Sequence, residues 1–202
     1  MKESIIIVAN DLFLTLGFKS VTMDDIANKM GISKKTIYKH FNTKEALVNG
    51  CVTYIHEKIS KSICEITTMG YNAIKENFVI KNMFKGIFGK SKTSPMYQLQ
   101  KYYPKTFKKV MSNEFQIFEE CVGTNIDKGI KEGLYRKDIN RNLSLKFYFI
   151  LIFGLHDALI FDHTKYKVNE LEIKVLEYHT RAMATDRGIK ELEKELTKIN
   201  QL

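Results

Sequence analysis

The stretch from Thr22 to Lys44 constrains the fold of this chain more than any other part of the sequence. Apolar residues recur at helical spacing on both sides of Gly31, a residue that can end a helix at little conformational cost. Thr22 and Ser33 stand where the two helices should begin, and both are residue types that cap helix N-termini. Asp25, three residues after Thr22, completes a variant of the capping box. The pattern predicts two short helices joined by a tight turn.

The second of these helices, expected over Ser33–Phe41, should bury Ile37 and Phe41 and expose the opposite face. From Ser33 to Lys44 there are four lysines and no acid. An exposed helix that carries cations, hydroxyls and an aromatic ring suits the bases and phosphates of a DNA major groove. We therefore interpret the stretch as a helix-turn-helix whose recognition helix is Ser33–Phe41. Its outward residues are Lys34, Lys35, Thr36, Tyr38, Lys39 and His40.

The charge of the chain also favours a polyanionic partner, because the formal net charge is +9 and the pI is near 9.3. Residues 1–50 contain seven Lys and five acids, so they contribute only +2 of this charge. A lysine-rich solvated surface would give the same overall balance. The local lysine cluster, and not the total charge, is what favours DNA.

The cysteines and the longest apolar segment exclude other classes of protein. Cys51, Cys64 and Cys121 are odd in number, widely spaced and without a CxxC motif, which argues against a disulfide framework and against a zinc site. We expect a cytoplasmic setting and no cofactor. The most apolar segment, Phe147–Leu155, is too short to span a bilayer, so we expect no membrane partner.

The remaining chain predicts helices throughout, and the expected fold class is all-α. A first helix over residues 3–16 should stop at Gly17 in the left-handed conformation. Asn42 with Glu45 forms a capping-box pattern, so a further helix should run from about Thr43 to near Met69. Helices are also expected over residues 73–88, 95–102, 104–132 and 169–185, around residues 189–199, and from Asn140 or Asn142 to about Phe161. The helix over 140–161 is apolar nearly all round, and a second subunit is the simplest cover for it.

Two segments, ANDLFLTLGF and VTMDDIANKMGISKKTIYKHFNTKEAL, resemble the N-terminal domain of the TetR (tetracycline-repressor-like) family over about residues 5–50. The resemblance implies a DNA-binding domain over residues 1–48, with the helix-turn-helix at about 22–41. It implies a helical effector-binding and dimerisation domain over residues 49–202. The implied function is that of a homodimeric transcriptional regulator, usually a repressor, on a palindromic operator. A small molecule would release it from the DNA, and no enzymatic activity is implied.

The resemblance also assigns DNA contacts by position. Residues at the groove-facing positions of the family are Lys34, Lys35, Thr36 and Tyr38, and those at phosphate-contacting positions are Thr22, Lys39, His40 and Lys44. Met23 departs from the family pattern, because many members have a polar residue there, so we expect no phosphate contact from it.

The effector should be apolar or aromatic, because the helices that could enclose a cavity are rich in aromatic residues. Tyr103 and His156 would make the polar contacts to this effector. The candidate lining residues are Phe84, Phe88, Tyr103, Phe107, Phe118, Cys121, Phe147, Phe153 and His156. A plain hydrophobic core would show the same spacing of aromatic residues.

Two other classes of protein remain open at this point. His156 and Asp157, with His163 and His179, would be the candidate ligands of an all-α metal hydrolase. Their spacing matches no known ligand set, and a pair in the core or at a dimer interface explains them more simply. A helical protein that binds a membrane surface through its basic face is the second. Neither class explains the pattern from Thr22 to Lys44.

Overall fold

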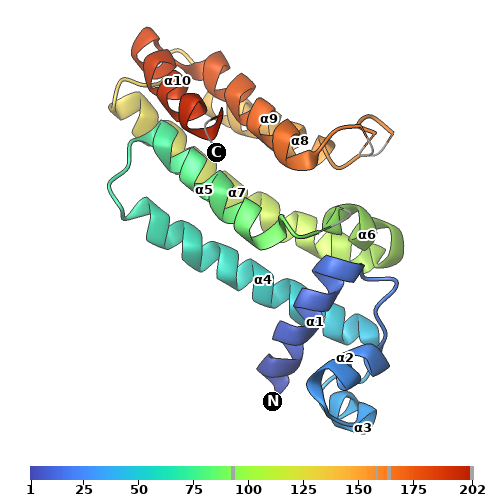
Figure 1. Cartoon of the computed structure of the whole chain (residues 1–202). Helices are drawn as coiled ribbons and strands as arrows, with labels where there is room; N and C mark the ends of the chain where they lie inside the picture. The colour runs from blue at the N-terminus through green and yellow to red at the C-terminus, as the bar shows by residue number, and fades with distance from the viewer. Residues whose placement is uncertain (92–93, 158, 163–164, 201–202) are drawn as a thin grey trace. The chain divides into compact units, whose positions relative to one another are not determined.

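The structure, a computed structural model, describes residues 1–91, 94–157, 159–162 and 165–200 (Figure 1). Its helices are α1 (Lys2–Leu16), α2 (Met23–Met30), α3 (Lys34–Tyr38), α4 (Lys44–Thr67), α5 (Ala73–Phe88), α6 (Pro95–Tyr102), α7 (Pro104–Lys131), α8 (Arg141–Gly154), α9 (Val168–Met183) and α10 (Asp186–Asn200). Within these residues there is no strand, only a single bridge between Tyr135 and Ala184. The expected all-α class is confirmed.

The helices form two compact units. Unit 1 contains Met1–Lys61 and Ile87–Asn113, and unit 2 contains Ser62–Gly86 and Glu114–Leu202. The sequence-based division after residue 48 stays a prediction. No helix in the part of the chain that the structure describes is long and apolar enough to cross a membrane.

Unit 1 has its own hydrophobic core, which holds the first three helices together. Phe13 of α1, Ile26 of α2 and Ile37 of α3 are fully or almost fully buried in it. Leu99 of α6 is part of the same core. The backbone N–H of Phe18 donates to the buried Gln98 Oε1 at 2.7 Å, which fastens α6 to the loop after α1.

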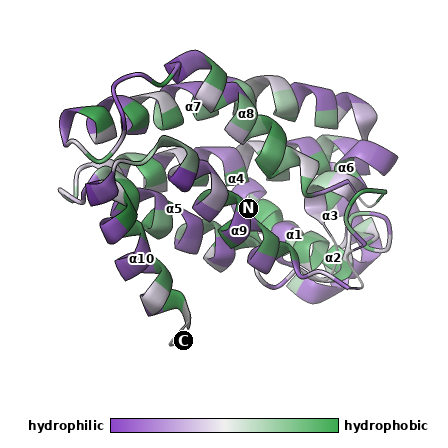
Figure 2. Cartoon of the chain, turned by 90° about the horizontal axis from the view of Figure 1, so that it is seen from above, coloured by the Kyte–Doolittle hydropathy of each residue, from purple (hydrophilic) through white to green (hydrophobic). Residues whose placement is uncertain are grey.

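Unit 2 is built from a second core. Ile74, Ile126, Leu145 and Leu192 are completely buried, one each from α5, α7, α8 and α10. α10 is mostly hydrophilic, with single hydrophobic residues at helical spacing, and Figure 2 shows both colours along it. That amphipathic pattern explains why a helix so rich in charge still packs on the core through one face.

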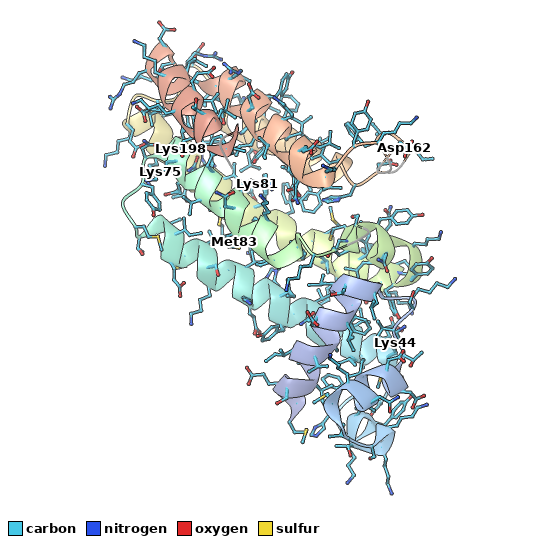
Figure 3. All side chains as sticks on the ribbon, viewed as in Figure 1. Lys44, Lys75, Lys81, Met83, Asp162 and Lys198 are labelled. Atoms are coloured by element: carbon cyan, nitrogen blue, oxygen red, sulfur yellow. The ribbon has the colours of Figure 1, made fainter. Side chains whose placement is uncertain are left out.

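A buried polar network crosses the core of unit 2. Asn125 Nδ2 donates to the carbonyl of Ala73 at 2.9 Å and to Glu76 Oε1 at 2.8 Å. Lys128 Nζ pairs with the other oxygen of Glu76 at 2.6 Å. Lys81, labelled in Figure 3, forms a second ion pair with Glu172 at 2.6 Å. These bonds satisfy buried polar groups that would otherwise destabilise the fold.

Several expected helix ends differ from the observed ones. α3 spans Lys34–Tyr38 and not Ser33–Phe41: Ser33 caps it, and Lys39 already closes its C-terminus. The N–H groups of His40 and Phe41 still donate to the Ile37 carbonyl, so the chain continues as a tight turn.

α8 ends at Gly154 and not near Phe161. The N–H of Asp157 bonds to the Gly154 carbonyl at 3.1 Å, and the Asp157 carboxylate accepts from the N–H of Leu159 at 2.9 Å. This Asp side chain competes with helical backbone bonding, and the apolar pattern that suggested a longer helix gives no sign of it.

Two capping predictions were wrong in detail. At the start of α4 the cap is Thr43 and not Asn42, since the Ala46 N–H donates to Thr43 Oγ1 at 3.0 Å. Gly17 has φ +93° and ψ 149°, which is not the left-handed helical conformation. A Cβ on Gly17 would lie 2.8 Å from Gln98 Oε1, so the turn here is shaped by the approach of α6.

Candidate nucleic-acid interface

The turn between α2 and α3 has the geometry that the sequence predicts. The Thr22 hydroxyl accepts from the Asp25 N–H at 3.1 Å, and the Thr22 N–H donates to Asp25 Oδ2 at 2.8 Å, so the capping box is complete. These bonds, first that of the Thr22 backbone, lower the pKa of the Asp25 carboxyl. Gly31 adopts φ +64°, in the left-handed region. α3 therefore begins at a fixed direction relative to α2.

α3 presents one face to the core of unit 1 and the other to solvent. Ile37 is completely buried, and Phe41 just after the helix is almost so. The Ser33 hydroxyl accepts from the Thr36 N–H at 3.1 Å and lies 2.8 Å from the Thr36 hydroxyl. Tyr38 is 40% exposed. The other exposed side chains between Lys34 and His40 are those of Lys34, Lys35, Lys39 and His40.

The three lysines of this face differ in their surroundings. Lys34 Nζ bonds to Asp24 Oδ2 of α2 at 2.6 Å, and this hydrogen bond raises the pKa of Lys34. Lys35 and Lys39 have no carboxylate partner among the described residues. An approaching phosphate would meet Lys35 and Lys39 directly, whereas Lys34 would have to leave Asp24.

Two of the side chains expected to contact phosphates already form hydrogen bonds within the protein. The Thr22 hydroxyl donates to Asp25 Oδ2 at 2.8 Å while it caps α2. Lys44, labelled in Figure 3, donates to the Lys19 carbonyl at 3.2 Å and lies over the Phe13 ring. Partial burial lowers the pKa of Lys44, and the nearby Asp25 carboxylate opposes that change.

Met23 lies in the core of unit 1, only 5% exposed. An apolar residue here strengthens the packing of α2, and its side chain is not available to a phosphate. The departure from the family pattern therefore has a structural reason.

The candidate effector residues do not form one group. Tyr103 and Phe107 pack against the core of unit 1. Phe118 of α7 and Phe153 of α8 both contact the Phe149 ring in unit 2, with centroids at 5.2 and 4.3 Å. The others in unit 2 are Cys121, whose pKa is raised first by burial, Phe147, and the half-buried His156. Phe84 and Phe88, on α5, are half-buried.

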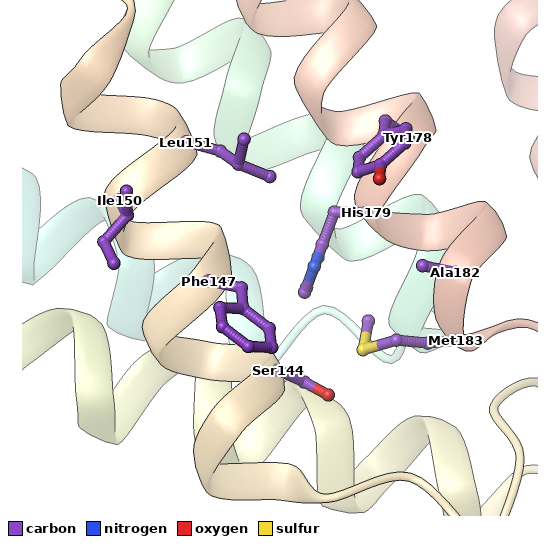
Figure 4. Close-up of a pocket in the computed structure, with 8 residues that line it drawn as sticks. All are labelled: Ser144, Phe147, Ile150, Leu151, Tyr178, His179, Ala182 and Met183. Carbon is purple, nitrogen blue, oxygen red and sulfur yellow. The ribbon is translucent and has the colours of Figure 1, made fainter.

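A hollow of about 320 Å³ lies between α8 and α9 in unit 2 (Figure 4). Among the candidate effector residues, Phe147 lines it. The complete lining is Ser144, Phe147, Ile150, Leu151, Tyr178, His179, Ala182 and Met183. Three of these, Phe147, Ile150 and Tyr178, are 59%, 65% and 68% exposed, so the hollow is open to the surface.

Three polar residues, Ser144, Tyr178 and His179, line this hollow, and His179 is the most buried of them. It is 5% exposed, and its ring stacks on Tyr148 with centroids 4.1 Å apart. Burial lowers its pKa to about 4, so the ring is neutral near pH 7. Its Nε2 has no hydrogen-bond partner in the described part of the chain. The sequence suggested His179 either as a metal ligand or as part of a core or dimer-interface pair, and it gave no sign that this histidine lines a hollow.

The metal-hydrolase alternative finds no support among the described residues, where no three His, Cys, Asp or Glu side chains gather as a metal site would require. His163 lies outside the described residues.

Residues 5–51 match the family model of bacterial regulatory proteins, tetR family. The chain has a TetR-family N-terminal domain. This agrees with the resemblance seen in the sequence, and the family consists of transcriptional regulators and not of enzymes. The matched residues contain the whole of α2 and α3, most of α1 and the start of α4.

Curated relatives include transcriptional regulators of the same type. The transcriptional repressor KstR2 of Rhodococcus jostii is 25% identical over 146 residues, which are 69% of this chain and 70% of KstR2. The negative transcriptional regulator IcaR of Staphylococcus aureus is 32% identical over 92 residues, 44% of each chain. The regulator AlkX of Mycobacterium tuberculosis is 24% identical over 96 residues, 48% of this chain. The chain thus spans less than half the length of IcaR and of AlkX.

Solved structures share the fold over nearly the whole chain. A transcriptional regulator from Cytophaga hutchinsonii superposes with a TM-score of 0.74 at 21% identity, covering 91% of this chain and 98% of the other. A likeness at this identity concerns the fold alone. The helices of both units therefore follow an arrangement already known from a regulator.

Proposed function

We propose that the chain is a sequence-specific DNA-binding transcriptional regulator, and that α3 is its recognition helix. The observation that carries the proposal is the exposed face of α3. Lys35 and Lys39 project there beside Tyr38, with no acidic partner in the described part of the chain, while Ile37 fixes the helix to the core. The TetR-family match of residues 5–51 supports the same assignment.

The family positions of the side chains on and after α3, together with their surroundings, support a proposed role for each. Lys35, Thr36 and Tyr38 face the bases, and Lys39 and His40 contact phosphates beside them. Lys34 reaches a guanine O6 or N7 only after leaving Asp24, so DNA and Asp24 compete for the same ammonium. Thr22 and Lys44 contact phosphates through groups that are held in place by Asp25 and by the Lys19 carbonyl.

We propose that two copies bind a palindromic operator, with a second copy covering the apolar surface of α8. Leu143, Phe147 and Ile150 are spaced by four and three residues, so they share one face of α8, and all three are largely exposed. An apolar surface of this kind marks a contact site. Phe147→Glu with Ile150→Glu should give a monomer by sedimentation, and a dimer of unchanged strength would refute this contact.

We also propose that the regulator is a repressor that a small apolar or aromatic ligand releases from its operator. KstR2 is named a repressor and IcaR a negative regulator, which supports repression over activation. The aromatic rings of Phe115, Phe118, Phe149 and Phe153 in unit 2 suit an apolar ligand. Screening apolar compounds for release of the bound operator, with Phe149→Ala as the insensitive variant, tests this.

The experiment that tests the DNA-binding proposal compares matched lysine variants on an operator duplex by fluorescence anisotropy. Lys39→Gln should weaken binding to all sequences. It should also reduce the steepness of log K against log salt concentration, here called the salt slope, by about 1, the change expected for one phosphate contact. Lys35→Gln should also change the sequence preference. Lys198→Gln, which removes a charge paired with Glu195 on α10, is the control and should bind as the wild type. Equal salt slopes in all four proteins would contradict the assignment of α3.

A further inference from the structure

The segment between residues 77 and 113 contains eight lysines and no Asp or Glu. Much of the net charge of +9 therefore lies here and not in the helix-turn-helix. Lys81 is buried against Glu172, but Lys101, Lys105, Lys108 and Lys109 are all exposed. They belong to α6 and the first turns of α7, in unit 1, which is also the unit of α3.

These lysines stand on a rigid part of unit 1. Thr106 and Val110 are buried on one side of α7, and the Thr106 hydroxyl donates to Asn49 Oδ1 at 2.8 Å. Lys105, Lys108 and Lys109 share the other side at spacings of three and four residues.

Like charges at this spacing repel, and the four lysines have no carboxylate partner among the described residues. Two exposed lysines of unit 2 have a different environment: Lys194 and Lys198 each pair with a glutamate three residues earlier.

Lys101 of α6 is linked by a series of contacts to Lys44 at the start of α4, where the resemblance implies a phosphate contact. Lys44 donates to the carbonyl of Lys19, and Lys19 Nζ lies 5.4 Å from the centre of the Tyr102 ring. Lys101 Nζ lies 5.6 Å from the Tyr102 and Tyr97 rings. Cation–π contacts of this kind hold the ammonium groups in place and leave their charge exposed.

We propose that this basic strip contacts the phosphates of DNA that flanks the half-site read by α3. The strip consists of Lys19, Lys101, Lys105, Lys108 and Lys109 with Tyr97 and Tyr102. The inference rests on the proposed DNA-binding function and extends its contact surface. A membrane is the other polyanion to consider. However, the exposed large hydrophobic residues of the described segment 94–113 are the two tyrosines, and a membrane-surface helix needs Leu, Phe or Trp to insert.

The test compares two duplexes: the operator alone, and the operator extended by about ten base pairs of unrelated sequence at each end. The strip variant is Lys101→Gln, Lys105→Gln and Lys109→Gln. The control variant, Lys167→Gln, Lys194→Gln and Lys198→Gln, removes the same charge from lysines of unit 2 that are paired with glutamates.

With the wild type and the control, the extended duplex should give a salt slope steeper by about 2 than the operator alone. The strip variant should lose that difference and bind the operator alone as the wild type does. A strip variant with the full difference on the extended duplex would overturn the inference and leave the proposed function intact. Equal binding of wild type to operator and scrambled duplex would instead refute the proposed function. Strip-dependent binding to phosphatidylserine vesicles, with no gain on extended DNA, would assign the strip to lipid and overturn the proposal.

Discussion

The buried imidazole of His179 should make the fold sensitive to mild acid. Its pKa in the folded chain is about 4, against 6.5 for the free side chain, because burial removes the water that would solvate the charged ring. Because the folded-state pKa is the lower one, the neutral ring stabilises the fold fully above about pH 6.5. This stability falls as the pH drops below 6.5 and is lost completely near pH 4.

The size of the effect follows from the same two values. A difference of about 2.5 in pKa corresponds to about 3 kcal/mol of folding free energy in total. At pH 5 about 2 kcal/mol of this should already be lost. His179→Phe keeps an aromatic ring to stack on Tyr148 but cannot be protonated, so it should not show this loss.

Urea unfolding followed by circular dichroism, at pH 7.5 and 5.0 and at fixed protein concentration, measures the effect. The wild type should lose about 2 kcal/mol more than His179→Phe between the two pH values. His40→Gln, a change at an exposed histidine, is the control and should lose as much as the wild type. Equal losses in the wild type and in His179→Phe would refute the reasoning about burial.

Two further predictions concern the stability of single helices. Thr22→Ala removes the side-chain cap of α2 and should lower the free energy of unfolding by about 1 kcal/mol. Thr22→Ser keeps the hydroxyl and should be nearly as stable as the wild type. Equal losses in the two variants would contradict the role of the hydroxyl. Gly129→Ala places a Cβ against the buried Tyr135 ring and should cost about 1–3 kcal/mol. Gly86→Ala, with open space around it on α5, should instead raise the melting temperature, and the same loss in both would show that packing does not decide the outcome.

The sequence was most informative where local chemistry decides the structure. The cap at Thr22 depends on Asp25 three residues later, and Gly31 ends α2 by donating to carbonyls three and four residues earlier; both were confirmed. The bounds of α5 and α6 were predicted correctly for the same reason, since apolar spacing and Pro95 at a helix start are local signals.

Longer-range contacts were not predictable from such signals. The conformation of Gly17 depends on Gln98, which is far away along the chain. The pairing of Lys34 with Asp24 joins two helices across a turn, and the side-chain pattern of α3 alone makes Lys34 look as free as Lys35.

The candidate effector residues show most clearly what the spacing of residues in the sequence cannot predict. Aromatic residues at helical spacing in the sequence include both Phe107, which packs on the core of unit 1, and Phe147, which is exposed at the hollow of unit 2. Periodicity indicates which residues share a helix face, but the partner of that face depends on the tertiary arrangement. His179 and Tyr178 were therefore missed as lining residues.

The central claim is that α3 reads a DNA sequence. Selection of bound duplexes from a random pool, by the purified protein at physiological salt, tests it most directly. We predict recovery of a palindrome whose half-site centres lie about 34–36 Å apart or a multiple of that distance. A Tyr38→Ala and Lys35→Ala variant should recover a different or weaker motif. Uniform, salt-sensitive binding without any motif would contradict the claim and leave only a basic surface.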